Sequence, residues 1–314
     1  MEYSKGEKVY CFPQMGIYTD MFMEFFRDLG LNAMKPPEIS ARTIKLGVKY
    51  SPDMICYPFK VTLGNFIECL EADATDLIMY NSCGTCRYRQ YYIIQDLIMK
   101  DLNYKFTMHQ LRPRQLLKDL KKLNPENSYL KIIRVIRKHW KKIKELEDAY
   151  HGEIDPNDIN IGVVGEIFTV LEPRVNMQVV AKLKKGGVKV HSYVNVRHLI
   201  TDSFGFNKFK KNENFKAARM YLDGGTLGGH GVENIRDTIY FVKSKIDGIV
   251  HLLPLSCMPE TTIEPVLNKI CYEANIPILR LSIDETNSEL NMETRLETFV
   301  ELIKRKKQHL KAKA

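Results

Sequence analysis

Two cysteines in a Cys-x-x-Cys spacing, Cys83 and Cys86, stand in the segment MYNSCGTCRYRQYYI at residues 79–93. They follow a short apolar run and precede a stretch of arginines and tyrosines. Such a pair is compatible with a redox disulfide, with half of a zinc site, or with part of an iron–sulfur site. The sequence has no second close pair, so any further thiolate ligand must come from a cysteine that stands alone.

The other cysteines differ in their surroundings. There are seven in all, an odd number spread along the chain, which is not typical of a disulfide framework and indicates reduced thiols. Cys69 and Cys271 fall on apolar helix faces and Cys11 falls at a strand end, so we expect these three to be core residues. Cys56 and Cys257 are each followed two residues later by proline, which favours an ordered loop that presents the thiol to a cleft.

Soft thiolate ligands select iron–sulfur clusters, zinc or copper. From residue types alone, Cys56, Cys83, Cys86 and Cys257 are therefore the candidate metal ligands, and the identity of the metal stays open.

Short apolar runs alternate with longer amphipathic ones, the pattern of βα units and parallel sheets. We expect strands near 7–12, 76–80, 104–108, 160–165, 187–191, 247–253 and 277–281. We expect helices near 17–29, 38–49, 60–70, 87–101, 112–122, 173–185, 230–244, 261–274 and 291–307. In open α/β sheets ligands bind at the carboxyl ends of strands, and Cys83, Cys86 and Cys257 follow such ends.

The length of 314 residues predicts two α/β lobes joined by a long basic helix. That helix is indicated by apolar residues spaced 4, 3, 4 and 3 apart, at Tyr129, Ile133, Ile136, Trp140 and Ile143. The expected division is an N-terminal lobe at 1–124, a connecting helix and linker at 125–158, and a C-terminal lobe at 159–314.

Composition excludes several classes of protein. With 44% hydrophobic and 27% charged residues, and no apolar run of the ~18 residues that a spanning helix needs, we expect a protein outside the membrane. The N-terminus lacks the pattern of a secretory signal, which favours the cytoplasm. The net charge of +9 equals that of residues 100–147, which hold 14 Lys and Arg against 5 Asp and Glu. Because no nucleic-acid motif accompanies it, we expect this segment to face an acidic partner or phosphate groups.

Several polar residues are candidates for the site. Glu166 and Glu260 follow strands and could donate a proton, or each could cap the helix that follows. Arg87, with Arg89, could favour a thiolate or bind a phosphate, or could lie on a solvated helix face. Gly228 and Gly229 precede a predicted helix and could hold a phosphate of coenzyme A through backbone N–H groups, or could form a plain loop.

The order of several unusual strings resembles the 2-hydroxyacyl-CoA dehydratase family, in particular its branch of CoA protein activases and activase-related proteins. The resemblance covers nearly the whole chain. The matching segments lie at 12–30, 46–80, 86–104, 163–191, 228–260 and 280–306, and they contain the strings CYPFK at 56–60, CRYRQY at 86–91 and CMPE at 257–260.

This resemblance implies flavodoxin-like lobes with a 4Fe-4S cluster in the cleft between them, held by three cysteines from separate loops. Position by position, the cluster ligands fall on Cys56, Cys86 and Cys257. Cys83 departs from the family pattern, where a small residue is common, and is left as a fourth ligand or a bystander. Three thiolates would leave one iron open to substrate, whereas four would restrict the cluster to electron transfer.

In the dehydratases a separate ATP-dependent activator passes an electron to the cluster, which then assists removal of the 2-hydroxyl group of an acyl-CoA. This chain has no G-x-x-x-x-G-K-S/T motif, so the activator is expected to be a partner protein. A homologous second subunit or a second copy of the chain is expected as well. If the chain is an enzyme, the resemblance implies a dehydratase-type lyase or a related low-potential reductase. The alternative is a non-catalytic electron-transfer or cluster-assembly protein with four cysteine ligands.

Overall fold

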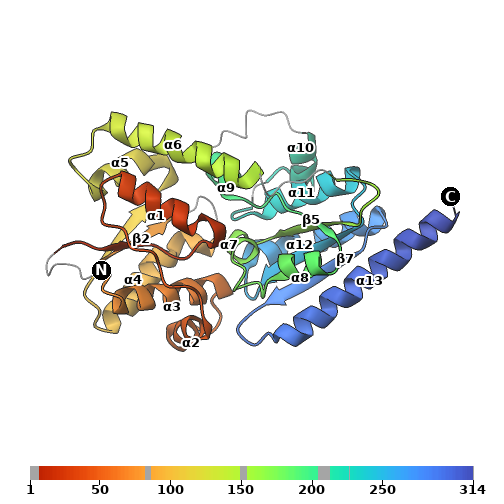
Figure 1. Cartoon of the computed structure of the whole chain (residues 1–314), viewed down its shortest axis with the longest axis horizontal. Helices are drawn as coiled ribbons and strands as arrows, with labels where there is room; N and C mark the ends of the chain where they lie inside the picture. The colour runs from red at the N-terminus through yellow and green to blue at the C-terminus, as the bar shows by residue number, and fades with distance from the viewer. Residues whose placement is uncertain (1–6, 82–85, 149–153, 204–212, 226, 314) are drawn as a thin grey trace.

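The computed structural model describes residues 7–81, 86–148, 154–203, 213–225 and 227–313. Within them the chain forms two parallel β-sheets, one from each half of the sequence (Figure 1). This confirms the predicted α/β class. The lobe limits at residues 124 and 158 stay a prediction, because the positions of the elements do not by themselves define units that fold alone.

The N-terminal sheet contains β1 (Tyr10–Cys11), β2 (Asp76–Tyr80) and β3 (Thr107–Leu111) in the order β1-β2-β3. On its other edge, β1 makes a parallel bridge between Tyr10 and Ala33. Ala33 can be counted as a one-residue strand that follows β1 in the sequence. Across the sheet, the strands then lie in the order second, first, third and fourth of the sequence, which is the doubly wound order of flavodoxin.

The C-terminal sheet contains β4 (Asn160–Gly165), β5 (Lys189–His191), β6 (Gly248–Pro254) and β7 (Ile278–Ile283) in the order β5-β4-β6-β7. This is again second, first, third and fourth, so both halves have the same topology although their sequences show no repeat. Every residue of β4 and β6 is buried. Such apolar runs are expected for parallel strands covered on both faces by helices.

The structure describes thirteen α-helices around the two sheets. One of them, α6, lies beside both halves (Figure 1). In the N-terminal half they are α1 (Thr19–Asp28), α2 (Ala41–Tyr50), α3 (Tyr57–Glu71), α4 (Tyr91–Asp101), α5 (Leu116–Leu123) and α6 (Tyr129–Asp148). In the C-terminal half they are α7 (Ile167–Leu171), α8 (Val179–Lys185), α9 (Val196–Ser203), α10 (Glu213–Met220), α11 (Gly231–Lys243), α12 (Met258–Glu273) and α13 (Glu289–Lys313). None of the described helices has both the length and the apolar character needed to cross a membrane.

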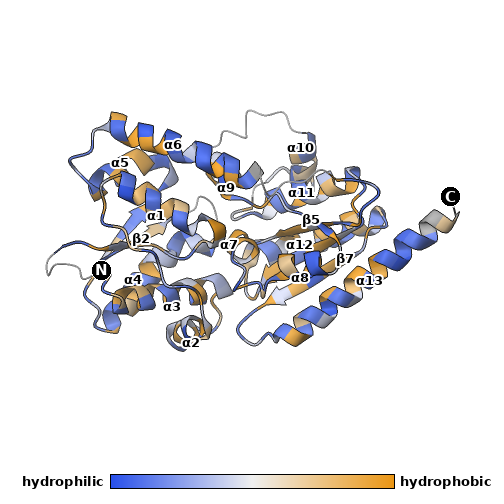
Figure 2. Cartoon of the chain, in the orientation of Figure 1, coloured by the Kyte–Doolittle hydropathy of each residue, from blue (hydrophilic) through white to orange (hydrophobic). Residues whose placement is uncertain are grey.

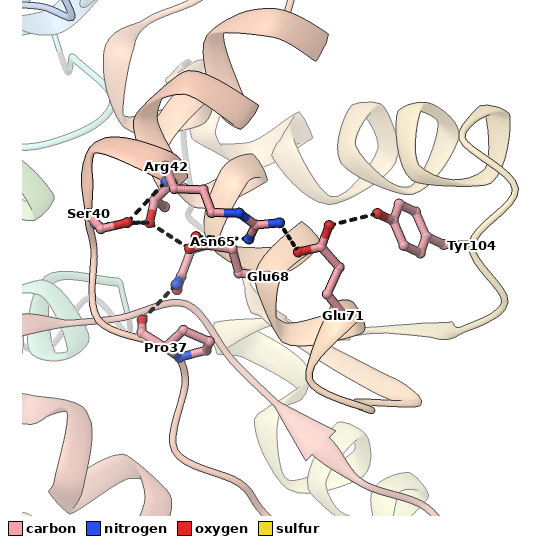
Figure 3. Close-up of polar contacts among 8 residues, drawn as sticks. Pro37, Ser40, Arg42, Asn65, Glu68, Glu71 and Tyr104 are labelled. Carbon is pink, nitrogen blue, oxygen red and sulfur yellow. Dashed lines mark hydrogen bonds and ion pairs between the residues drawn. The ribbon is translucent and has the colours of Figure 1, made fainter.

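Helices α2 and α3 pack unusually closely. A Cβ atom added at Gly47 would lie 1.8 Å from the Lys60 carbonyl oxygen, and one added at Gly64 would lie 1.9 Å from the Thr43 carbonyl oxygen. The two glycines therefore let the helix backbones touch. Figure 3 shows polar contacts beside this junction, where Arg42 pairs with both Glu68 and Glu71.

Helix α6 is amphipathic, as predicted, but its buried face is rotated. Its buried side chains, among the described residues, are Ile132, Val135, His139, Ile143 and Glu147, whereas Tyr129 is 49% exposed. Figure 2 shows the resulting alternation of hydrophobic and hydrophilic turns along α6. The predicted residues Ile133, Ile136 and Trp140 lie beside the buried row and line a cavity.

The three cysteines predicted to be core residues are fully buried, which confirms that prediction. Cys11 and Cys69 lie in one apolar cluster with their sulfur atoms 2.7 Å apart. Cys271 lies in another apolar cluster, beneath β6. None of the three lines the cavity at the strand ends.

Candidate functional site

Three of the candidate ligands stand immediately before helices. Cys56 precedes α3, Cys257 precedes α12, and Cys86 precedes a short 3-10 turn that runs into α4. Each has an extended backbone, and none of the three thiols accepts a capping hydrogen bond from its helix. Pro58 and Pro259 occupy the first turns of α3 and α12, where a missing N–H costs nothing. Each thiol therefore sits at the positive end of a helix, which favours an anion.

A cavity of about 960 Å³ lies at the carboxyl ends of the central strands. Residues that follow β1, β2, β4 and β6 all contribute to its wall, so it spans the points where strand order reverses in both sheets. Cys86 and Cys257 line one end of it together with Glu166 and Glu260. Cys56 does not line the cavity and is buried beside it.

Contacts between the two halves bring the three cysteine segments together. The N–H of Tyr57, next to Cys56, donates to the carbonyl oxygen of Leu255, two residues before Cys257, at 3.3 Å. A Cβ atom added at Gly229 would lie 3.7 Å from the Cys86 sulfur and 2.9 Å from Pro259 Cγ. Cys86 is therefore close to the first turn of α12, which Cys257 begins.

The thiols are held in their neutral form by their surroundings. Burial raises the pKa of Cys56 and Cys257, and it raises the pKa of Cys86 to about 12. The carboxylates of Glu166 and Glu260 raise the pKa of Cys86 and Cys257 further, because they oppose a second negative charge. A bound cation would reverse this balance, since metal ligation requires thiolates and releases their protons.

Cys56 has two specific neighbours. Its sulfur is 2.6 Å from the Tyr91 hydroxyl, and this hydrogen bond lowers the pKa of the thiol against the larger effect of burial. The charge of Arg87 acts in the same direction. Arg87 also donates to the carbonyl oxygen of Met54 at 3.0 Å, so its guanidinium holds the loop that precedes Cys56.

Glu166 has the capping role that the sequence left as its alternative. Its carboxylate accepts hydrogen bonds from the backbone N–H groups of Phe168 and Thr169, at 3.1 and 2.8 Å, and from the Thr169 hydroxyl at 2.9 Å. Burial raises the pKa of Glu166, and these hydrogen bonds lower it. The residue thus begins α7 and also borders the cavity.

Glu260 belongs to a buried network that the sequence analysis did not predict. Its carboxylate accepts from Asn234 Nδ2 at 2.9 and 3.0 Å and lies 2.8 Å from His251 Nε2. Asn234 also bonds both backbone groups of Gly165. The network ties α12 to β4, β6 and α11. Its signal in the sequence was a histidine inside the apolar strand GIVHLLP.

The remaining candidates lie as follows. Gly229 has a φ of +75° and packs against Pro259, so its backbone is part of the wall beside Cys86. Gly228 precedes it, two residues before the N-cap of α11. Cys83 belongs to residues 82–85 and lies outside the described residues.

Metal ligation is not preformed for a single ion. Among the described residues, no group of three or more His, Cys, Asp or Glu side chains is arranged to hold a metal ion. A 4Fe-4S cluster places a different demand on its ligands, because each thiolate binds a different iron atom. Three thiols at adjoining helix N-termini fit that demand in their chemistry and in the anionic charge that they would carry.

Fold and site together define a two-sheet α/β protein with cysteines gathered at the carboxyl ends of its strands. The chain belongs to the family described as CoA enzyme activase uncharacterised domain (DUF2229), whose profile matches residues 14–196. A second profile, 2-hydroxyglutaryl-CoA dehydratase, D-component, matches residues 232–303. The chain is therefore related to the 2-hydroxyacyl-CoA dehydratases, as its sequence predicted.

No curated protein matches the chain. Among solved structures, the SBP FpvC in complex with Ni2+ from P. aeruginosa is 11% identical, with 96% of this chain and 98% of that chain covered, at a TM-score of 0.27. A likeness at that score carries no argument about fold or ligand.

Proposed function

We propose that this protein binds a 4Fe-4S cluster through Cys56, Cys86 and Cys257 and acts on a CoA thioester after receiving an electron from an ATP-dependent activator. The observation that carries the proposal is the position of these three thiols, each at a helix N-terminus and all in segments that contact one another between the two sheets. The matches to activase and dehydratase profiles support the same chemistry.

When bound through three thiolates, such a cluster supplies one-electron chemistry and one iron that is open to an oxygen ligand. The protein's own residues define the surroundings. The three helix N-termini favour the negative charge of the thiolates. Glu166 and Glu260 border the cavity at the same end. Burial raises the pKa of Glu166, so that carboxyl group could hold a proton beside a substrate hydroxyl, and Glu260 could hydrogen-bond the same hydroxyl.

The activator and a second subunit are proposed as partners because dehydratase components act together. A homologous chain or a second copy of this one would fill the second role. The reaction class that follows is dehydration by a lyase, or reduction at low potential by a related reductase. The cytoplasm is the proposed location, since thiols of this kind need a reducing compartment.

The test is iron analysis of protein purified without oxygen. The wild type should contain about four irons per chain and should be brown. Serine variants of Cys56, Cys86 and Cys257 should each lose most of that iron, because each removes one ligand. Cys271→Ser is the matched control, since Cys271 is buried in a separate apolar cluster and should leave the iron content unchanged.

Cys83→Ser separates the two forms of the proposal. Partial or no loss of iron is expected if three cysteines bind the cluster. Complete loss, equal to that of Cys86→Ser, would instead support a four-cysteine cluster that only transfers electrons. Stoichiometric zinc without iron in the wild type would contradict both forms.

A further inference from the structure

The cavity continues well beyond the cysteines. Its walls under α6 are apolar and come from three helices that are distant in the sequence. We define the α6 chamber by the lining residues Phe22, Phe26, Ile133, Trp140, Ile143 and Ile200. Helices α1 and α6 contact each other, and α6 also contacts α9, so packed elements form this part of the cavity wall.

The chamber is large enough for an organic group. The whole cavity, at about 960 Å³, is at the upper end of the range for sites that hold drug-sized ligands. Its lining is predominantly hydrophobic side chains, with Glu166 and Glu260 at the cysteine end. A ligand that reacts at the cysteine end therefore has an apolar space within the same cavity.

Charged groups are placed at the edge of this space. The Lys and Arg side chains that line the cavity are Arg114, Lys118 and Arg137, and all three residues are exposed. They give its opening a positive potential, which favours an anionic ligand. They lie where water screens them, so they are poor partners for a carboxylate buried deeper in the chamber.

The physical balance then favours one kind of ligand. Apolar surface moved from water into the chamber stabilises the bound state in proportion to its area. His139, the imidazole that α6 contributes to the lining, already pairs with the Asp28 carboxylate at 2.7 Å. A ligand carboxylate moved there would meet that negative charge and would lose its hydration with little in return. Resting on the function proposed above, we propose that the α6 chamber binds the apolar acyl part of a CoA thioester, an aryl or medium-length alkyl group, in preference to a dicarboxylic acyl group such as glutaryl.

The single tryptophan of the chain provides the test. Trp140 lines the chamber, so its fluorescence reports an occupant directly. Full-length protein would be titrated without oxygen with octanoyl-CoA, glutaryl-CoA and free CoA. We expect octanoyl-CoA to change Trp140 fluorescence with a Kd at least tenfold lower than that of either of the other two.

Two variants on α6 form a matched pair. Ile133 lines the chamber, whereas Leu130, one helical turn earlier, is 77% exposed. Ile133→Asp should raise the Kd for octanoyl-CoA at least tenfold, and Leu130→Asp should leave it unchanged. If circular dichroism shows that Ile133→Asp does not fold, Ile200→Gln on α9 takes its place with the same expectation.

The outcomes are distinguishable from those of the iron test. Equal affinity for octanoyl-CoA and glutaryl-CoA, or for octanoyl-CoA and free CoA, overturns the inference even if the protein contains iron. Preference for octanoyl-CoA in protein that never binds iron would support the chamber while the cluster proposal fails. An octanoyl-CoA affinity that Ile133→Asp and Leu130→Asp lower equally would place the acyl group elsewhere.

Discussion

At Gly229 a single hydrogen atom in place of a side chain lets Cys86 approach α12. The residue has a φ of +75°, and a Cβ atom there would lie 2.9 Å from Pro259 Cγ. We predict that Gly229→Ala lowers the free energy of unfolding by about 2–4 kcal/mol, from left-handed strain and from overlap with Pro259. Chemical denaturation would measure this loss, and iron content should fall with it.

Gly224 is the control for this prediction. It has the same φ of +75° but no atom within 4 Å of an added Cβ. Gly224→Ala should therefore show the left-handed strain alone, about 1–2 kcal/mol, and full iron content. Equal losses in both variants would mean that the contact with Pro259 is not needed.

Some features of the candidate site residues were predictable from the sequence, and others were not. Strand ends and proline positions are local signals, and they predicted that Cys56, Cys86 and Cys257 lie in loops before helices, as they do. Their role as ligands stays a prediction. The partners of Glu260 could not be predicted, because Asn234 and His251 reach it from two other elements and no spacing along the chain links them. Glu166 could be placed at a strand end, but only the three donors around its carboxylate establish its capping role.

Among the elements, α5 depends on one buried carboxylate in its first turn. Asp119 is 4% exposed and accepts hydrogen bonds from the backbone N–H and the Nε of Arg112, both at 2.9 Å. We predict that Asp119→Asn lowers the free energy of unfolding by about 1–2 kcal/mol near neutral pH, because the Arg112 guanidinium loses a charged hydrogen-bond acceptor. The loss is no larger because Arg112 is partly exposed, and water solvates its charge in the variant. Urea denaturation of both proteins measures the difference.

The same pair predicts a dependence on pH. Burial raises the pKa of Asp119, but the Arg112 hydrogen bonds and charge outweigh it, so the folded pKa lies below the ordinary 3.8. The contribution of Asp119 is therefore fully present above that value and is lost as the pH falls through the lower, folded pKa. The gap between wild type and Asp119→Asn should be constant from about pH 5 to 7 and should narrow below about pH 4. A gap that widens on acidification would contradict the assignment.

Periodicity predicted the long elements better than the short ones. All seven described strands overlap predicted ones, since apolar runs between turn residues are strong signals. The least accurate is β3, which was predicted at 104–108 and lies at Thr107–Leu111. The short helices α7, α9 and α10 were missed, since helices of eight residues or fewer carry little periodicity. The equally short α5 and α8 were predicted, but as parts of longer helices. The helix predicted at 173–185 begins only at Val179, because Met177 and Gln178 have φ values of +54° and +58°, outside the helical region.

For the molecule as a whole, the two sheets share a strand order that no sequence repeat revealed. The points at which the strand order reverses in the two sheets face a common cavity. This arrangement follows from the topology of the whole chain, and no single segment of the sequence indicates it. The rotation of α6 is also a tertiary effect. Its inner row packs against α1, and this leaves the predicted row of Ile133, Ile136 and Trp140 to line the cavity.

An ion pair between Lys60 on α3 and Glu285 after β7 joins the two halves next to the site. The Lys60 Nζ lies 2.5 Å from Glu285 Oε1, and the two side chains are 6% and 21% exposed. Removing one partner leaves the other charge poorly solvated. We predict that Lys60→Met lowers the free energy of unfolding by about 1–3 kcal/mol. Because Lys60 is one helical turn from Cys56, iron retention should fall as well.

A double-mutant cycle with Glu285→Gln measures the coupling of this pair, and a cycle with Arg305→Met and Glu301→Gln is its control. The Arg305–Glu301 pair has a similar distance, 2.7 Å, but its side chains are 77% and 54% exposed. Because water screens exposed pairs, its coupling should be below about 0.5 kcal/mol, against at least about 1 kcal/mol for Lys60 and Glu285. The double variant Lys60→Met with Glu285→Gln should recover part of the lost stability, since no unpaired charge remains. Equal coupling in the two cycles would show that the junction depends on apolar packing and backbone contacts such as Tyr57 to Leu255, and that the buried charge does not hold the halves together.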